Sequence, residues 1–512
     1  MSANRQIAKN MLFNLGVFII NTGISFFLSP YLIKTVGKEA YSFYPLVSNI
    51  VQYSNIITAA IGSMAGRFIT MEIYGNRIKE AEGYFNSVLL ANWLLSLFFG
   101  LLTLIGVIYI ADILTVPDHL ILDVRWLFAL SAIATIITIN SDLLGIGTYI
   151  KNRIDLNSMM RMAWALVNVI VIISLFLTCK SSIIYIGIAS LIASIICIGF
   201  NISFKRKLLP ELSITPFSTF SFEKIKILVS SGIWNSINQL SNVLLTHIDL
   251  LITNIFIGAA ATGDFALVKM APNLIYTLLA LLTGSFIPNF NILYAKKQYD
   301  ELLHEVKKSI KVVGVLICIP LGFLLVFADD FFSLWVPTSN SNYLHWLSFA
   351  TVLPMVFGSS VNPVFGVFTI TNRLKIPSIV LLLCGIINTI VICVLLKTTN
   401  LGIWSIPIVS GIQHVLRNFF FTPMYAASCL KQKLGVFYPA VYRCCLALFI
   451  VCISGYCVKM IIPENSWLLL ATKALAMTFV SLLLNVYIIF NSQERNYLLT
   501  RIKGLTNKLN IR

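Results

Sequence analysis

The sequence has few charged residues. Asp, Glu, Lys and Arg make up 11% of its 512 residues, and only 20 of these are acidic. An average soluble domain is about 25% charged. Hydrophobic residues reach 58%, so a soluble fold would have too little polar surface to cover its apolar side chains. The composition therefore excludes an ordinary soluble protein and predicts a chain that lies in lipid.

Sequence motifs for common chemistries are also absent. There is no Walker phosphate loop, HExxH helix, nucleophile elbow or CxxC pair. The ten cysteines lie mostly inside apolar runs, where they are typical of small buried hydrophobes rather than of disulfides or metal ligands. We expect no metal, no cofactor and no enzymatic activity. A membrane-embedded transferase is the enzyme alternative, with the acids of the predicted outer loops as candidates: Asp112, Asp118, Asp123, Asp329 and Asp330.

Long apolar runs follow one another along the chain. A helix needs about 20 apolar residues to cross the hydrocarbon core. Fourteen runs meet this need, at 11–33, 41–65, 86–110, 126–149, 158–178, 182–203, 228–254, 265–290, 311–328, 343–369, 377–396, 401–424, 440–458 and 467–490. The first is too long for the apolar segment of a signal peptide. The sequence therefore predicts an all-α integral membrane protein of about fourteen transmembrane helices.

Basic residues are distributed unevenly between the two sides. If residue 1 lies in the cytoplasm and the spans alternate, 28 of the 37 Lys and Arg residues fall on cytoplasmic segments and 6 on outer segments. This bias follows the positive-inside rule. It predicts a multi-pass protein of the cell (inner) membrane with both termini cytoplasmic, and it explains the net charge of +17 without a nucleic-acid partner.

The chain also contains an internal repeat. An offset of about 221 residues maps Asn14 and Asn21 onto Asn235 and Asn242, and Gly37 onto Gly258. We therefore expect two parallel six-helix lobes followed by two extra helices. The expected boundaries are 1–215, 216–430 and 431–512, the last including a basic cytoplasmic tail.

Polar residues inside the spans are the candidates for function. In the seventh span Asn235, Gln239, Asn242, Thr246 and Asp249 are spaced by four, three, four and three residues, which places them on one face of an α-helix. Lipid would be a costly environment for this face, so it is predicted to line a wet cavity or to hold helices together. Asn14 and Asn21 form a shorter stripe in the first span.

Charged residues within the spans are fewer. Lys269 and Asp249 fall in the outer half of adjacent spans, where they could form a gate, a coupling site or a structural ion pair. Asp142 and Arg417 fall in the cytoplasmic third of their spans, and Arg417 could contact substrate or extend to the interface. Lys473 could meet a lipid head group or extend to the interface.

Four short segments carry a resemblance to a known family. These are Pro30–Tyr41 (PYLIKTVGKEAY), Gly66–Phe68 (GRF), Ile248–Gly263 and Leu334–Pro337 (LWVP). Together with the topology they resemble the multidrug/oligosaccharidyl-lipid/polysaccharide exporter superfamily, and within it the polysaccharide flippases of the O-antigen type. Asp264 departs from the family pattern, which commonly has an apolar residue there.

The resemblance implies a function. It implies a flippase that moves polyprenyl-diphosphate-linked oligosaccharide across the cytoplasmic membrane by alternating access, for surface polysaccharide or lipopolysaccharide synthesis. A polysaccharide polymerase is then an additional candidate partner. Lys269 and Arg417 would meet the diphosphate, the Asn, Gln and Thr residues named above would bind the sugar, and Asp249 and Asp142 would serve coupling or gating. A flippase for a peptidoglycan precursor is a close variant of this interpretation. The alternative from another class is a cation-coupled multidrug exporter, which would favour acidic rather than basic cavity walls.

Overall fold

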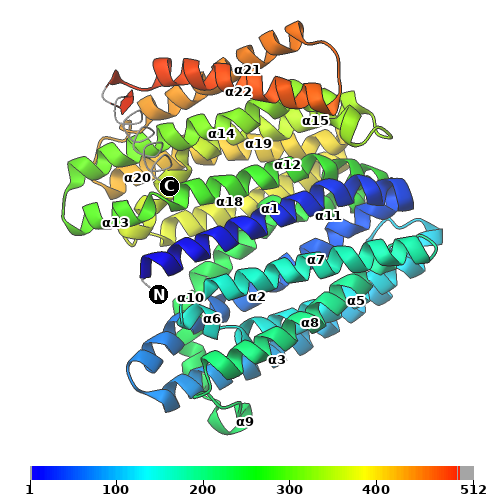
Figure 1. Ribbon diagram of the computed structural model, residues 1–512, viewed down its shortest axis with the longest axis vertical. Coiled ribbons are helices and arrows are strands. Elements are labelled where there is room, and N and C mark those ends of the chain that lie inside the picture. The colour runs from blue at the N-terminus through cyan, green and yellow to red at the C-terminus, as the bar shows by residue number, and fades with distance from the viewer. Residues whose placement is uncertain (1–2, 493, 496–512) are drawn as a thin grey trace. The chain divides into compact units, whose positions relative to one another are not determined.

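The computed structural model describes residues 3–492, 494 and 495 of the chain. Within these residues there are helices and no strands, which confirms the predicted all-α membrane fold (Figure 1). The helices are α1 (Ala3–Val36), α2 (Lys38–Tyr74), α3 (Ile78–Ile108), α4 (Ile110–Ile113), η1 (Asp118–Leu120), α5 (Ile121–Leu144), α6 (Gly147–Ile150), α7 (Ile154–Thr178), α8 (Ile184–Leu208), α9 (Pro216–Thr219), α10 (Phe222–Asn242), η2 (Val243–His247), α11 (Ile248–Phe256), α12 (Ala259–Gly284), α13 (Ile287–Ala295), α14 (Tyr299–Trp335), α15 (Ser341–Val352), α16 (Met355–Val361), η3 (Asn362–Val364), α17 (Phe365–Ile370), α18 (Lys375–Thr398), η4 (Gly402–Trp404), α19 (Ser405–Val415), η5 (Leu416–Phe421), α20 (Thr422–Cys429), α21 (Tyr438–Ile461) and α22 (Trp467–Ile489).

The helices form two compact units. Unit 1 comprises Met1–Ala266 and Ser378–Cys393, and unit 2 comprises Leu267–Pro377 and Val394–Arg512. Two helices therefore contribute to both units, α12 and α18. The helices α10, η2 and α11 belong to unit 1.

Most predicted spans correspond to continuous helices. Among the described residues, eleven helices are long and apolar enough to cross a membrane, and α2 makes a twelfth if its two parts, Lys38–Ile56 and Thr58–Tyr74, are one span bent by 59°. The other two predicted spans, 228–254 and 401–424, are also helical. Each is divided by a π-helical segment, η2 in the first and η5 in the second.

The internal repeat appears in the backbone. Asn76 and Lys297 lie 221 residues apart, and both adopt the left-handed conformation, with φ of 56° and 58°. Asn152 and Asn372 do the same 220 residues apart, each with φ of 53°. Each of the four ends a helix, and the next amide donates to the carbonyl five residues back, as in a Schellman cap. The glycines of the repeat, Gly37 and Gly258, share positive φ at the start of α2 and α12.

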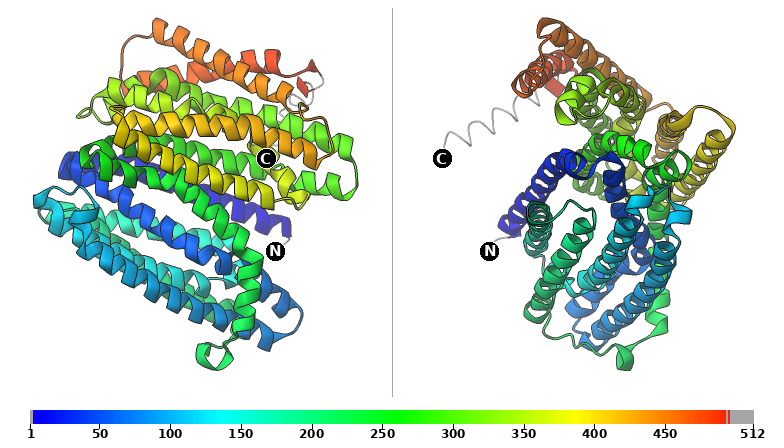
Figure 2. Two further views of the ribbon diagram at one scale, coloured as in Figure 1. Left: turned by 180° about the vertical axis from the view of Figure 1, so that it is seen from behind. Right: turned by 90° about the vertical axis from the view of Figure 1, so that its right-hand side faces the viewer.

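Unit 1 has closely packed helices. α5 and α8 lie side by side (Figure 1, Figure 2). Gly187 of α8 brings them together, since a Cβ there would lie 3.0 Å from Leu130 Cβ. α10 packs on α2 even more closely, because a Cβ at Gly232 would collide with the carbonyl oxygen of Ala60. By contrast Gly62, which the sequence pairs with Gly66 in a GxxxG pattern, has room for a side chain, since a Cβ there would meet nothing within 4 Å.

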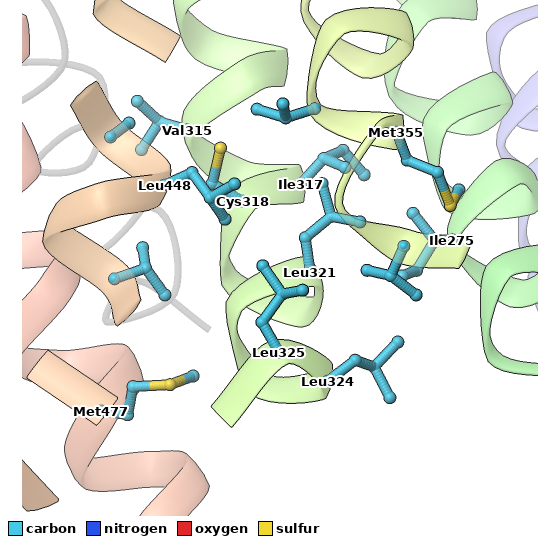
Figure 3. Packing of buried hydrophobic residues seen from close by; sticks show 14 of the residues in the cluster. Ile275, Val315, Ile317, Cys318, Leu321, Leu324, Leu325, Met355, Leu448 and Met477 are labelled. Atoms are coloured by element: carbon cyan, nitrogen blue, oxygen red, sulfur yellow. The ribbon is translucent and has the colours of Figure 1, made fainter. Parts of the chain in front are cut away.

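Unit 2 is built around α14. Its apolar face, including Cys318, Leu321 and Leu325, is buried against α12, α16, α21 and α22, as Figure 3 shows for part of this cluster. α21 approaches α14 at two glycines, since a Cβ at Gly314 or Gly322 would collide with side chains of α21. The two extra C-terminal helices are therefore packed directly onto the central helix of this unit.

Candidate functional site

The polar stripe of the seventh predicted span lies on α10 and η2, beside α2. Asn235 donates from Nδ2 to Ser63 Oγ of α2 at 3.0 Å. Gln239 is half-buried, Asn242 is exposed, and Thr246 donates to the Asn242 carbonyl at 2.6 Å. These residues thus combine accessible amides with one hydrogen bond between helices, and their role in binding sugar stays a prediction.

The π-helical segment η2 interrupts this stripe. A π-turn contains one residue more than an α-turn, so it shifts the phase of every later side chain. Asp249, which follows η2 in α11, is buried with 4% of its surface exposed, whereas Asn242, the last residue of α10 before η2, is exposed. The spacing argument assumed an uninterrupted α-helix, which the structure does not have between residues 243 and 247.

Two residues of α2 donate hydrogen bonds to a backbone carbonyl of η2. The sequence contained no pattern that predicted this role for them. The His247 carbonyl accepts from Asn49 Nδ2 at 2.9 Å and from Tyr53 Oη at 3.4 Å. The His247 ring also contacts Asn49, with Nδ1 3.1 Å from Oδ1. A polar clamp therefore holds the π-helical segment on α2.

The shorter stripe in the first predicted span has a different environment. Asn14 Oδ1 accepts from Ser158 Oγ of α7 at 2.7 Å, which makes it an interhelical contact. Asn21 lies on the exposed surface of α1. Asp142 is exposed on α5, near the end of that helix. Their predicted functional roles remain predictions.

The charges at the start of α1 and α7 form a cluster that was not singled out in the sequence. The side chain of Asp155 is fully buried and contacts Lys9 at 2.8 Å and Arg153 at 3.1 Å. Gln6 donates to the same carboxylate at 2.8 Å, and Asn10 accepts from the Asp155 amide at 3.0 Å. This network fastens the first turns of α1 to the start of α7.

The two predicted diphosphate-binding cations lie in unit 2. Lys269 is half-buried on α12, and Arg417 is half-buried in η5. Arg417 donates from Nε to Asn418 Oδ1 at 3.1 Å, and its carbonyl accepts from Thr422 Oγ1 at 3.1 Å. Asp249 belongs to unit 1 and Lys269 to unit 2, so their pairing stays a prediction.

Arg417 is part of a network that includes a histidine. His414 of α19 has Nδ1 2.7 Å and Nε2 3.5 Å from Asn418 Nδ2. Its Nε2 also lies 3.1 Å from Tyr276 Oη of α12. The missed signal in the sequence was the His-x-x-Arg-Asn spacing within an apolar run.

Ion pairs connect α14 with the C-terminal part of the chain at two places. Near one end, Lys473 has a fully buried side chain and contacts Asp330 at 3.1 Å. Lys459 contacts Asp329 at 2.8 Å and the same Asp330 at 3.8 Å. Lys473 is therefore held by an ion pair within unit 2, and its predicted place at a lipid head group or at the interface stays a prediction.

The second place lies toward the start of α14. Lys311 contacts Glu494, both nearly inaccessible. Burial alone would raise the pKa of Glu494. The hydrogen bond from Lys311, a backbone hydrogen bond from Asn491 and the nearby cations lower the pKa by more than burial raises it, so the pKa lies below its ordinary value.

Asp264, the residue that departs from the family pattern, also forms an ion pair. Asp264, near the start of α12, contacts Lys38 at the start of α2 at 2.7 Å. Among the described residues no group of three His, Cys, Asp or Glu side chains is placed to hold a metal ion.

Comparison with known proteins gives the following matches. No family model matches the chain. The uncharacterized membrane protein EpsK of Bacillus subtilis (strain 168) is 27% identical over 507 residues, which cover 97% of this chain and 98% of that protein.

Two kinds of solved structure share the fold. An inward-facing multidrug resistance MATE family transporter of the MOP superfamily matches with a TM-score of 0.64 at 15% identity, covering 81% of this chain and 95% of that one. The lipid II flippase MurJ, in an inward closed conformation, matches with a TM-score of 0.63 at 13% identity, covering 93% and 97%. The MATE multidrug transporter DinF-BH has a TM-score of 0.59 at 16% identity, covering 86% and 97%. The chain is therefore a multi-span helical membrane protein with the fold shared by MATE transporters and MurJ.

Proposed function

We propose that this protein is a flippase that moves a polyprenyl-diphosphate-linked oligosaccharide across the membrane by alternating access. The observation that carries the proposal is the extent of the match to the lipid II flippase. MurJ covers 93% of this chain, whereas the MATE structures named above cover 81% and 86%. The additional share is about the size of α21 and α22 together.

The chemistry of the candidate residues supports this substrate class. A diphosphate needs cations and hydrogen-bond donors inside a low-dielectric region, and Lys269 and Arg417 are cations within the helices of unit 2. A sugar needs groups that both donate and accept hydrogen bonds, and the side-chain amides of Asn235, Gln239 and Asn242 along α10 in unit 1 are such groups. The membrane is then the partner, and a polysaccharide polymerase the candidate for receiving the product.

The proposal can be tested with purified protein in liposomes. A fluorescent polyprenyl diphosphate oligosaccharide is incorporated in both leaflets, and the outer label is quenched with a membrane-impermeant reductant. Protein-dependent flipping makes the protected inner fraction decay as well. We expect Lys269→Ala and Arg417→Ala each to slow this decay by at least about tenfold, the effect of about 1.4 kcal/mol. Lys180→Ala, at an exposed residue between α7 and α8, should leave it unchanged.

A second function has one specific observation in its favour. The fold match to an inward-facing MATE transporter has a TM-score of 0.64, as high as that to MurJ. The same liposomes should therefore be tested with the cationic dye rhodamine 6G under a proton or sodium gradient. Gradient-dependent dye transport, with no flipping of the labelled lipid, would replace the flippase by a multidrug exporter.

A further inference from the structure

The network around His414 lies in the part of unit 2 that holds a predicted substrate-binding cation. Arg417 donates from Nε to Asn418 Oδ1, which leaves the Asn418 amide nitrogen to face the histidine ring. That nitrogen is a donor only. The ring must therefore offer it a lone pair, and a doubly protonated imidazole has none. The arrangement in the structure fits a neutral His414.

The ring is held closely from other sides. Tyr276 Oη lies 3.1 Å from Nε2 and can accept its hydrogen when Nδ1 carries the lone pair. Gly358 of α16 backs the ring, since a Cβ there would collide with Cε1 and lie 2.9 Å from Nε2. Any side chain at this position would displace the ring, so His414 is confined between α12, α16 and η5.

The local helix geometry adds to this. Residues 416–421 form a π-helical segment, so His414 precedes the π-turn and Arg417 and Asn418 lie within it. Single π-turns in α-helices occur frequently at functional sites. A histidine, an arginine and an asparagine gathered at such a turn, inside an apolar run, form a group whose charge changes when the ring binds a proton.

The surrounding elements supply few other titratable groups. Arg417 is the cation beside the ring, and Tyr276 is the neighbouring hydroxyl. α15, α16, η4 and α20 pack against α19 or η5, and α16 and η4 contain no titratable side chain. The titratable side chains of the other two, and of α21 where it meets Phe419, are Tyr343, His345, Tyr425, Cys429, Tyr438 and Tyr442. α12 also contains Lys269, seven residues before Tyr276, and Asp264, which pairs with Lys38. Among the described residues, the other helices named in this paragraph contain no carboxylate.

Protonation of His414 would make the site more favourable for an anion. An imidazolium beside Arg417 places two positive charges three residues apart, and it also opposes the Asn418 amide. The hydrogen bond from Arg417 to Asn418 then has to rearrange. An anion brought to the two cations would offset their repulsion, so proton binding and anion binding must favour each other reciprocally.

We propose that His414 takes up a proton when the substrate diphosphate binds at Arg417, so that the flippase carries a proton site coupled to its anionic substrate. This inference rests on the proposed function. The step is a single protonation: the proton comes from solution, binds the ring nitrogen that carries the lone pair, and leaves again when the diphosphate is released.

The test is calorimetric binding of polyprenyl diphosphate to the purified full-length protein. Titrations at pH 7 in buffers of different ionisation enthalpy give the number of protons taken up per diphosphate bound. Because the arrangement in the structure fits a neutral His414 before binding, its complete protonation should take up about one proton per diphosphate bound. The diphosphate also exchanges protons, so the readout is the difference between the wild type and His414→Gln.

Two further variants complete the design. His304→Gln, at an exposed residue of α14, is the matched control and should take up protons as the wild type does. Asn418→Asp places a carboxylate against the ring, which should keep His414 protonated before binding. This variant should therefore bind diphosphate without proton uptake. His414→Gln should give the same result for the opposite reason, because it has no ring to protonate, whereas in Asn418→Asp the ring is already protonated.

The outcomes separate the two proposals. Uptake that depends on His414 and is absent in Asn418→Asp supports the coupled site. Diphosphate binding with equal uptake in the wild type, His414→Gln and Asn418→Asp overturns it and leaves the flippase intact. If the wild type binds no polyprenyl diphosphate and transports only rhodamine 6G, the proposed function fails, and the coupled site fails with it.

Discussion

The buried pair of Lys473 and Asp330 makes a prediction about how the extra helices are held. The lysine side chain is fully buried, and its Nζ is 3.1 Å from the carboxylate. At an effective dielectric constant of about 20, two charges at this distance attract each other by about 5 kcal/mol before desolvation is subtracted. Breaking a buried pair by removing one partner typically costs about 3–5 kcal/mol.

The two single variants should differ because their remaining partners differ. Asp330 keeps Lys459 at 3.8 Å, so Lys473→Met should lower the free energy of unfolding by about 2 kcal/mol. Asp330→Asn leaves a fully buried ammonium group, so its cost should reach about 3–5 kcal/mol. The double variant removes both charges and should be more stable than Asp330→Asn, within about 1 kcal/mol of the wild type.

The assay is unfolding of the purified protein in mixed micelles by increasing SDS, followed by circular dichroism. Lys180→Met removes an exposed lysine and should not shift the transition. If the double variant is less stable than either single variant, the two effects are additive and the residues are not coupled. That result, or an unchanged Lys473→Met, would refute the reasoning.

Three further predictions concern packing, backbone and pH. Gly232→Ala should destabilise the α2–α10 contact by about 1–3 kcal/mol, because the new Cβ meets a backbone carbonyl, whereas Gly62→Ala should be neutral or stabilising; the same SDS titration measures both. Lys297→Gly should raise the free energy of unfolding in that titration by about 1 kcal/mol, because φ of 58° is unfavourable for a residue with a Cβ. The pKa of Glu494 is lowered in the folded protein, so its pair with Lys311 stabilises the fold only while the carboxyl group is ionised. This stabilisation is fully present above the ordinary glutamate pKa of about 4.3 and is lost as the pH falls below it and through the lower pKa of the folded state. Glu494→Gln should reduce that loss of stability, measured by the same titration at neutral and acidic pH, and an identical pH dependence would contradict the prediction.

The fold was largely predictable because its signals are local. Apolar runs of sufficient length predict the membrane spans. The Asn-Arg pairs at 152–153 and 372–373, which lie 220 residues apart, indicate the internal repeat. The structure shows why these positions match: Asn152 and Asn372 both end a helix in the left-handed conformation, which asparagine tolerates better than most residues. Lys297 is the instructive case, since its conformation equals that of Asn76 without a matching side chain.

The site was less predictable because helix phase and ion pairing are not local. A π-turn requires no characteristic composition, so the stripe from Asn235 to Asp249 could not reveal its own interruption at η2. Lys473 and Asp330 are 143 residues apart, and hydropathy treats each as an isolated charge. Polar residues within the spans therefore identified where function could be, while their partners depended on tertiary packing.

The repeat itself shows how the two halves came to differ. Arg153 and Arg373 occupy equivalent caps, but two residues later the chain has Asp155 in one half and Lys375 in the other. Asp155 neutralises its arginine and binds Lys9, whereas Arg373 and Lys375 are both exposed. The same backbone therefore carries a closed ionic network in the first half and a basic surface in the second. Asp155→Lys would place a third cation beside Lys9 and Arg153 in a buried site, so it should lower the free energy of unfolding by about 3–5 kcal/mol. Lys375→Asp, at an exposed position, should leave the free energy of unfolding within about 0.5 kcal/mol of the wild type. The SDS titration measures both, and equal effects of the two substitutions would contradict this account of the asymmetry.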